Sequence, residues 1–222
     1  ADALDEILEL SYVYAKLLNP KIETDPIISR ELDYIKTLEI NVAYPFLMPV
    51  YRDYSLNIIT REQFAAILRL VQSYVWRRFI LSLPTNALNK IFMSLYDRVD
   101  PADYVASIER SLMQRTGTQR FPRDAEVIAM LREKDLYSTK SRTRTYFFER
   151  LENHNNRESV DVTIPDITIE HIFPQNPDPA WHIGLDADEY DLLSEKYLNT
   201  AGNLTLSGNN GRLGNKTFSE KR

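Results

Sequence analysis

The stretch Ile167-Thr168-Ile169-Glu170-His171-Ile172 separates two kinds of sequence in this chain of 222 residues. Its β-branched residues predict a strand, and Gly202-Asn203-Leu204-Thr205-Leu206 predicts a second one. Between them, Asp186 is a helix N-cap with Glu189 at the third helical position, and the helix runs to Tyr197. The C-terminal part of the chain therefore combines two short strands with helices.

The residues upstream of these strands are typical of consecutive helices. In the clearest case, Thr60 and Gln63 form a capping box, and apolar side chains then recur at helical spacing from residue 64 to residue 79. The apolar segment 44–51 contains two prolines, so we expect its helix to be short, kinked or to begin at a proline. These patterns predict a mainly α fold.

Charge is distributed unevenly along the chain. Residues 110–150 carry a net charge of +5, whereas residues 151–209 carry −9, although the whole chain carries only −5. The change from basic to acidic sequence falls close to the turn-like residues 153–156 and to the start of β-branched sequence. We therefore expect an all-helical body over residues 1–155 and a second domain over residues 156–222.

The composition excludes several classes of protein. The chain has no cysteine, which excludes disulfide scaffolds, thiolate zinc sites and cysteine nucleophiles. No stretch approaches the roughly 18 apolar residues that a membrane span needs, and the first residues lack a secretory signal. We expect a cytoplasmic protein with no membrane partner. Imidazole chemistry has three candidates, which are His154, His171 and His182.

The adjacent pair Glu170 and His171 is the feature most indicative of chemistry. Neighbouring side chains of a regular strand point to opposite faces, so one core cannot satisfy both. If the strand ends or twists there, both can approach a common ion or water. Glu170 then supplies an oxygen ligand to a hard divalent cation, and His171 is suited to be a general base.

The motif Glu-His-Ile-x-Pro-Gln at 170–175, followed by Gly-Asn-Leu-Thr-Leu at 202–206, resembles a known family. With Asn210 and the segment 215–221 (Asn-Lys-x-Phe-x-x-Lys), it is similar to the C-terminal HNH nuclease domain of GmrSD-type restriction proteins. These are His-Me finger, or ββα-metal, nucleases that follow a ParB-like nucleotide-hydrolysing domain. No counterpart of that N-terminal domain is found, so the chain looks like a C-terminal fragment: a helical body followed by a small ββα-metal domain.

The resemblance implies a metal-dependent DNA endonuclease of restriction and antiviral defence, and it assigns roles to individual residues. His171 matches the general base, Glu170 the acidic metal ligand and Asn203 the asparagine that braces the hairpin. Asn210 matches the last HNH position and a metal ligand, with Asn215 as the competing candidate. The implied catalytic set is therefore His171, Asn203 and Asn210.

The same resemblance implies cofactors and partners. The cofactor is a divalent metal ion, Mg²⁺ or Mn²⁺, and a nucleotide is expected only in the missing N-terminal half. The partners are that nucleotide-hydrolysing domain and double-stranded DNA, with modified phage DNA as one form of it. The basic residues that we expect to contact phosphate groups are Arg142, Arg144, Lys216 and Lys221.

Two alternatives remain open from the sequence. One is a non-catalytic helical regulatory or interaction module with a degenerate HNH remnant. The other is a nuclease that acts on RNA. The first is disfavoured because the glutamate, the histidine and the asparagines of the motif are all present, whereas a decayed site would have lost one of them.

Overall fold

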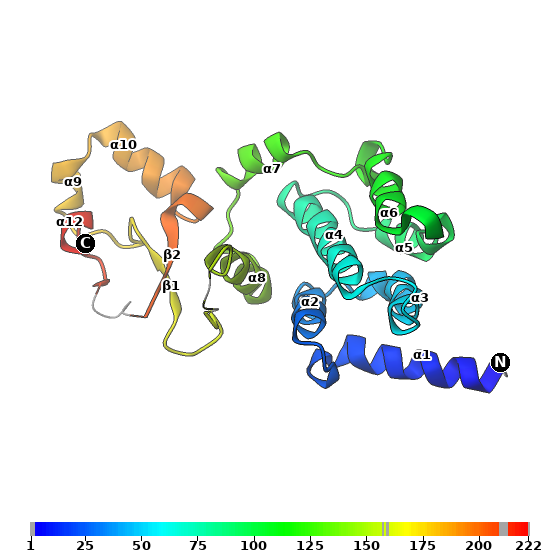
Figure 1. Cartoon of the computed structure of the whole chain (residues 1–222). Coiled ribbons are helices and arrows are strands. Elements are labelled where there is room, and N and C mark those ends of the chain that lie inside the picture. The colour runs from blue at the N-terminus through cyan, green and yellow to red at the C-terminus, as the bar shows by residue number, and fades with distance from the viewer. Residues whose placement is uncertain (1–2, 157, 159, 209–212, 222) are drawn as a thin grey trace. The chain divides into compact units, whose positions relative to one another are not determined.

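The structure is a computed structural model that describes residues 3–156, 158, 160–208 and 213–221. It is mainly helical with a small two-stranded sheet, as the sequence predicts (Figure 1). The chain divides into two compact units, residues 1–123 and residues 124–222, and each unit is described by itself.

The first unit consists of helices and short 3-10 turns around one apolar core (Figure 1). The central helix α4 packs against α2, α3 and α6. The bounds of the helices are α1 Ala3–Leu18, α2 Pro26–Thr37, α3 Tyr44–Ser55, α4 Arg61–Ile80, α5 Leu88–Met93 and α6 Tyr104–Met113.

Helix α4 begins at the predicted capping box. The Oγ1 of Thr60 accepts a hydrogen bond from the backbone N–H of Gln63 at 3.2 Å, and the Oε1 of Gln63 accepts one from the N–H of Thr60 at 2.8 Å. These two bonds satisfy N–H groups that the first helical turn leaves without partners. The predicted apolar face is buried, and Phe64, Ile67 and Tyr74 are fully enclosed.

The segment with two prolines forms helix α3, which has a proline in its first turn. This agrees with one of the three expected forms, a helix that begins at a proline. Pro45 lies in its first turn, where the missing N–H costs nothing, and Pro49 lies inside the helix. Because Phe46, Leu47 and Val50 are fully buried, packing against the core outweighs the hydrogen bond that Pro49 removes.

The second unit places helices around an antiparallel pair of strands, β1 and β2 (Figure 1). The two predicted strands are present, and so is the predicted helix that ends at Tyr197. Asp186 and Glu189 form the expected capping box at its start. The β-branched residues 160–164 form turns. The bounds are α7 Asp124–Leu131, α8 Ser141–Glu152, β1 Thr168–His171, α9 Trp181–Gly184, α10 Ala187–Asp191, a π-helical turn Leu192–Tyr197, β2 Leu204–Ser207 and α12 Phe218–Lys221.

The predicted domain boundary at residue 155 falls inside the second unit. The backbone N–H groups of Leu136 and Tyr137 donate hydrogen bonds to the carbonyl of Asn199, at 2.9 and 3.2 Å. The segment between α7 and α8 is thereby joined to the chain just before β2. These contacts link residues more than 60 positions apart, and local sequence patterns do not reveal them.

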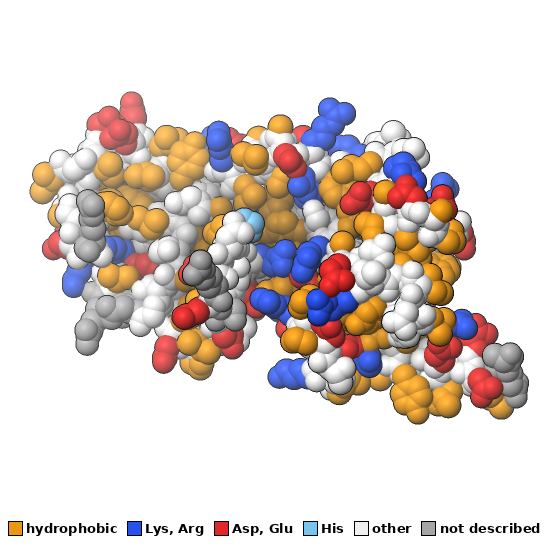
Figure 2. Space-filling model, in the orientation of Figure 1, with side chains coloured by type: hydrophobic (Ala, Val, Ile, Leu, Met, Phe, Trp, Pro, Cys, Tyr) orange, Lys and Arg blue, Asp and Glu red, His pale blue; other side chains and the backbone are white. Residues whose placement is uncertain are grey.

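Helix α1 exposes much of its apolar side-chain surface. Leu4 is 71% exposed and Tyr12 65%, and Figure 2 shows apolar side chains along this helix. The same helix carries Glu6 and Glu9, whose carboxylate oxygens lie within 3.5 Å of the guanidinium of Arg52 in α3. None of the helices that the structure describes is both long enough and apolar enough to cross a membrane.

Candidate functional site

Glu170 and His171 are the last two residues of β1, and both are buried. In the antiparallel register, Glu170 is paired with Thr205 and His171 with Leu204 of β2. The two side chains point away from each other, as strand geometry dictates, and contact different parts of the fold. A polar side chain that is buried needs a hydrogen-bonding partner, and each of the two has one.

The imidazole of His171 is held by two residues from other segments. Its Nε2 lies 3.2 Å from Oδ1 of Asn199, and the ring of Tyr137 contacts it edge-on with the ring centroids 4.4 Å apart. Asn199 in turn donates from Nδ2 to Oδ2 of Asp135, at 3.2 Å. The result is a chain of polar groups, Asp135–Asn199–His171, which we call the histidine relay.

The histidine relay fixes the tautomer of His171. A carboxylate only accepts hydrogen bonds, so Asp135 must receive the amide nitrogen of Asn199, and the amide oxygen then faces His171. An amide oxygen also only accepts, so Nε2 of the imidazole carries the proton. In the neutral ring Nδ1 is then the unprotonated nitrogen, which is the ring atom able to accept a proton.

Asp135 is itself anchored in a tight turn. Its Oδ1 accepts from the backbone N–H of Ser138 at 2.8 Å, and its Oδ2 accepts from the Ser138 hydroxyl at 2.7 Å. Burial acts to raise the pKa of Asp135, but the hydrogen bonds from Ser138 and Asn199 outweigh it and hold that pKa below its ordinary value. Asp135 is therefore held as the carboxylate that orients Asn199.

Glu170 forms a buried ion pair with Lys221. The Nζ of Lys221 lies 2.5 Å from Oε1 of Glu170, 2.9 Å from the carbonyl oxygen of His171 and 3.4 Å from that of Ile172. The side chains of Glu170 and Lys221 are 8% and 7% exposed. Carboxylate and carbonyl oxygens are also the donors that hard divalent cations prefer.

Asn203 braces the hairpin between β1 and β2. Its Oδ1 accepts from the N–H of Phe173 at 2.7 Å, and its Nδ2 donates to the carbonyls of Phe173 and Leu198 at 2.9 and 2.8 Å. Its own carbonyl accepts from the N–H of Ile172 at 2.9 Å. These bonds join the end of β1 to the start of β2, so Asn203 fixes where the two strands meet.

The other predicted site residues are more scattered. Asn215 and Lys216 are exposed, and the structure gives hydrogen bonds to their backbone carbonyls, from the N–H of Asp178 at 3.4 Å and from Nε1 of Trp181 at 3.2 Å. Asn210 lies outside the described residues. No group of three or more His, Asp or Glu side chains that could hold a metal ion occurs in the described part of the chain.

The two predicted arginine contacts differ from one another. Arg142 is exposed. The guanidinium of Arg144 donates to the carbonyls of Tyr137 and Thr139 and lies over the Tyr137 ring, 5.2 Å from its centroid. Arg144 therefore supports the tyrosine that contacts His171, which is a structural task besides any contact with phosphate.

An apolar cavity of about 670 Å³ lies beside the hairpin brace. Apart from Arg132, its side chains bring no charged group, so it offers no acid or base for hydrolysis. It lies between α7, α8, the π-helical turn and the chain before β2, and its apolar lining includes Ile128, Leu131, Phe147, Leu151, Leu193 and Tyr197.

Sequence reasoning missed Asp135, Tyr137 and Asn199, the three residues that orient His171. Asp135 and Ser138 have the spacing of a side-chain-capped turn, and Asn199 comes shortly before Asn203. Neither signal indicates that the two segments meet at His171, because that depends on tertiary packing.

Comparison with known families gives one match. Residues 121–222 match the family described as GmrSD restriction endonucleases, C-terminal domain. The matched segment is just under half of the chain, and it begins close to the start of the second compact unit. Neither curated proteins nor solved structures give a match.

Proposed function

From the match of residues 121–222 to the C-terminal domain of GmrSD restriction endonucleases, we propose that the chain is the DNA-cleaving part of a restriction enzyme, an HNH endonuclease. The observation that carries the proposal is the histidine relay, which leaves Nδ1 of His171 as a proton acceptor at the end of β1. The proposed ββα-metal fold covers residues 156–222. Asp135, which holds Asn199 against the proposed general base His171, lies outside that range.

The proposed reaction is hydrolysis of a phosphodiester bond. Nδ1 of His171 removes a proton from a water molecule, whose oxygen attacks phosphorus while the bond to the leaving oxygen of the sugar breaks. Asn199 stabilises the imidazolium that forms, because its amide oxygen accepts from Nε2–H. General-base assistance of this kind contributes about 10²- to 10⁴-fold to the rate.

The proposed cofactor is Mg²⁺ or Mn²⁺. The residues present fit a cation. The ammonium group of Lys221 lies among three oxygen atoms, one from the Glu170 carboxylate and two from backbone carbonyls, and so stands where a hard metal ion would bind. Glu170 would hold the ion, with Asn210 or Asn215 as the further predicted ligand, and Lys221 would move aside. A bound divalent ion would stabilise negative charge on the phosphate and the leaving oxygen.

The proposed substrate is double-stranded DNA, including modified phage DNA. Arg142 and Lys216 are exposed and are the better candidates for phosphate contacts. Arg144 and Lys221 are engaged with backbone carbonyls and with Glu170, so we expect their charge to act on phosphate only after rearrangement. An N-terminal nucleotide-hydrolysing domain remains the proposed regulatory partner, in a cytoplasmic protein.

The alternative of a non-catalytic module is not favoured. A degenerate remnant has no reason to keep a buried histidine with a fixed tautomer, because buried polar groups cost free energy unless they are satisfied. The family description also concerns restriction endonucleases. The experiment below distinguishes a nuclease that cleaves RNA from one that cleaves DNA.

Nicking of supercoiled plasmid tests the proposal. We expect the chain to convert supercoiled plasmid to the open-circle form in the presence of Mg²⁺ or Mn²⁺ and to leave it intact in EDTA. A single-stranded and a duplex RNA of equal charge serve as competing substrates. Cleavage of RNA alone would reassign the substrate, and undiminished nicking in EDTA would contradict the metal requirement.

A further inference from the structure

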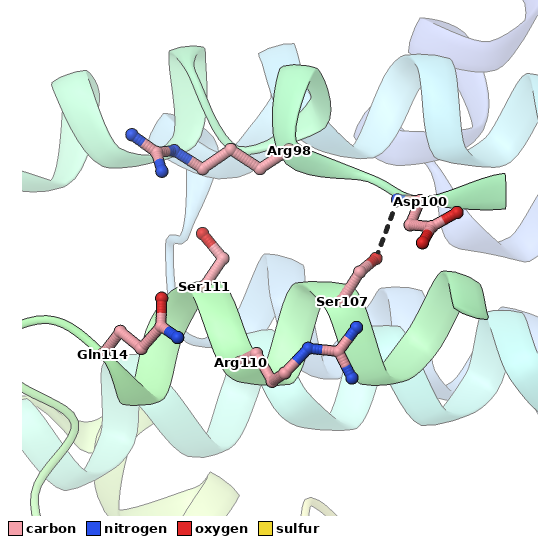
Figure 3. A pocket seen from close by; sticks show the side chains of 6 residues that line it. All are labelled: Arg98, Asp100, Ser107, Arg110, Ser111 and Gln114. Carbon is pink, nitrogen blue, oxygen red and sulfur yellow. Dashed lines mark hydrogen bonds between the residues drawn. The ribbon is translucent and has the colours of Figure 1, made fainter. Parts of the chain in front are cut away.

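A polar pocket of about 230 Å³ is lined by residues of the first unit, none of which belongs to the proposed nuclease site. It is bounded on one side by the chain from Arg98 to Asp100 and on the other by α6 (Figure 3). Every side chain in its lining is charged or polar: Arg98, Asp100, Ser107, Arg110, Ser111 and Gln114.

One end of this pocket carries hydrogen-bond donors without partners. The hydroxyl oxygen of Ser111 is buried and has no hydrogen-bond partner among the described residues. Figure 3 shows Arg98 extending over the same end from the opposite wall, with Gln114 one turn along α6 from Ser111. Arg98 is exposed, and within the described parts of the chain no carboxylate lies within ion-pair distance of its guanidinium. An unsatisfied buried hydroxyl is costly, which points to a missing acceptor.

The charges around the pocket leave a positive excess at this end. Arg115 lies just beyond the C-terminal end of α6; burial and the positive charge of Arg98 lower its pKa, and its buried Nε also has no partner among the described residues. Arg110 is already paired with Asp103 at 2.7 Å. The Asp100 carboxylate lies toward the other end, where its Oδ1 accepts from the N–H of Ala102 at 3.0 Å.

We propose that this pocket binds a phosphate group of the nucleic-acid backbone, with Arg98 as the charged ligand and Ser111 and Gln114 as hydrogen-bond donors. Guanidinium groups suit phosphate because they combine permanent charge with several N–H donors. The lining has no aromatic or aliphatic wall on which a base could stack, so the pocket reads the backbone and not the sequence. The choice of ligand rests on the proposed function, which supplies DNA as the substrate.

Equilibrium binding of a fluorescent DNA duplex tests this site. The full chain carries His171→Ala, so that the duplex stays intact during the measurement. Arg98→Gln is compared with Arg30→Gln, which removes another exposed positive charge, from α2, a helix that does not line the pocket. We expect Arg98→Gln to weaken binding about tenfold for all sequences and to lower the salt slope of log K by about 0.9, whereas Arg30→Gln changes binding less than twofold.

Ser111→Ala separates a binding role from a structural one. The substitution removes a hydroxyl that has no partner, so we expect the unfolding midpoint to stay unchanged or rise while DNA affinity falls about threefold. Equal binding by the Arg98 and Arg30 variants overturns the proposed site even if the wild-type chain cleaves DNA. The proposed site is also overturned if Arg98→Gln abolishes binding of inorganic phosphate but leaves DNA binding unaffected. Absence of any DNA binding overturns both this site and the proposed function.

Discussion

Replacing Asn199 by alanine removes the group that sets the tautomer of His171. The backbone carbonyl of Asn199 still accepts from Leu136 and Tyr137 in the variant, so the fold of the segment is retained. The lost hydrogen bond at 3.2 Å is between neutral groups and contributes about 1 kcal/mol. That free energy corresponds to about a fivefold change in the ratio of the two tautomers.

The expected effect on cleavage follows from this ratio. If only the tautomer population changes, the single-turnover rate of plasmid nicking falls about fivefold, and if the ring also shifts, the loss reaches about a hundredfold. DNA affinity stays unchanged, because Asn199 has no part in the proposed phosphate contacts. In ¹⁵N NMR spectra of the imidazole, wild-type His171 is expected as the Nε2–H tautomer and the variant as a mixture.

Asn153→Ala is the matched control for Asn199→Ala. The Asn153 side chain donates to the carbonyls of Glu149 and Val160 and accepts from the N–H of Val160, all within 3.0 Å and without contact to His171. We expect this variant to lose stability but to keep its cleavage rate below the unfolding transition. A wild-type rate and an unchanged imidazole spectrum in Asn199→Ala would refute the role of the histidine relay.

Three further predictions concern charge and stability. Lys221→Met leaves the buried Glu170 carboxylate without its cation. Calorimetry should show that the free energy of unfolding falls by about 3–5 kcal/mol and that Mg²⁺ restores part of it. An unchanged unfolding midpoint would contradict the buried pair. Asn203→Ala leaves buried backbone groups of Phe173 unsatisfied, and urea unfolding should show a loss of about 3 kcal/mol; a change below about 0.5 kcal/mol would count against the brace. The pKa of Asp135 is lowered in the folded state, so its stabilisation is complete above the ordinary aspartate pKa of about 3.9 and is lost as the pH falls through the lower folded value. Urea unfolding of wild type and Asp135→Asn between pH 6 and pH 2.5 checks this sign, since the difference between them should shrink toward the acid end.

Local sequence signals predicted the elements that depend on neighbours in the chain. The capping boxes at Thr60 and Asp186 and the two strands are all present in the structure. Each rests on side chains three residues apart or on a short run of strand-forming residues, and such signals are complete within a short window.

The surroundings of the candidate site were not predictable in the same way. Asn199 is 28 residues from His171 in the sequence, and Lys221 is 51 residues from Glu170. An asparagine and a lysine are common surface residues, and only the folded chain shows that these two contact the motif. The motif therefore indicated the candidate residues Glu170 and His171, and the structure added the residues that contact them.

The rate of plasmid nicking by His171→Ala, relative to that by His154→Ala, tests the central claim most directly. His154 is an exposed histidine of the same unit and lies outside the histidine relay, so its substitution controls for the loss of an imidazole. We predict that in Mg²⁺ the His171 variant cleaves at least about a hundredfold more slowly than wild type, while the His154 variant matches wild type. Equal rates for the two variants would contradict the assignment of His171 as the general base.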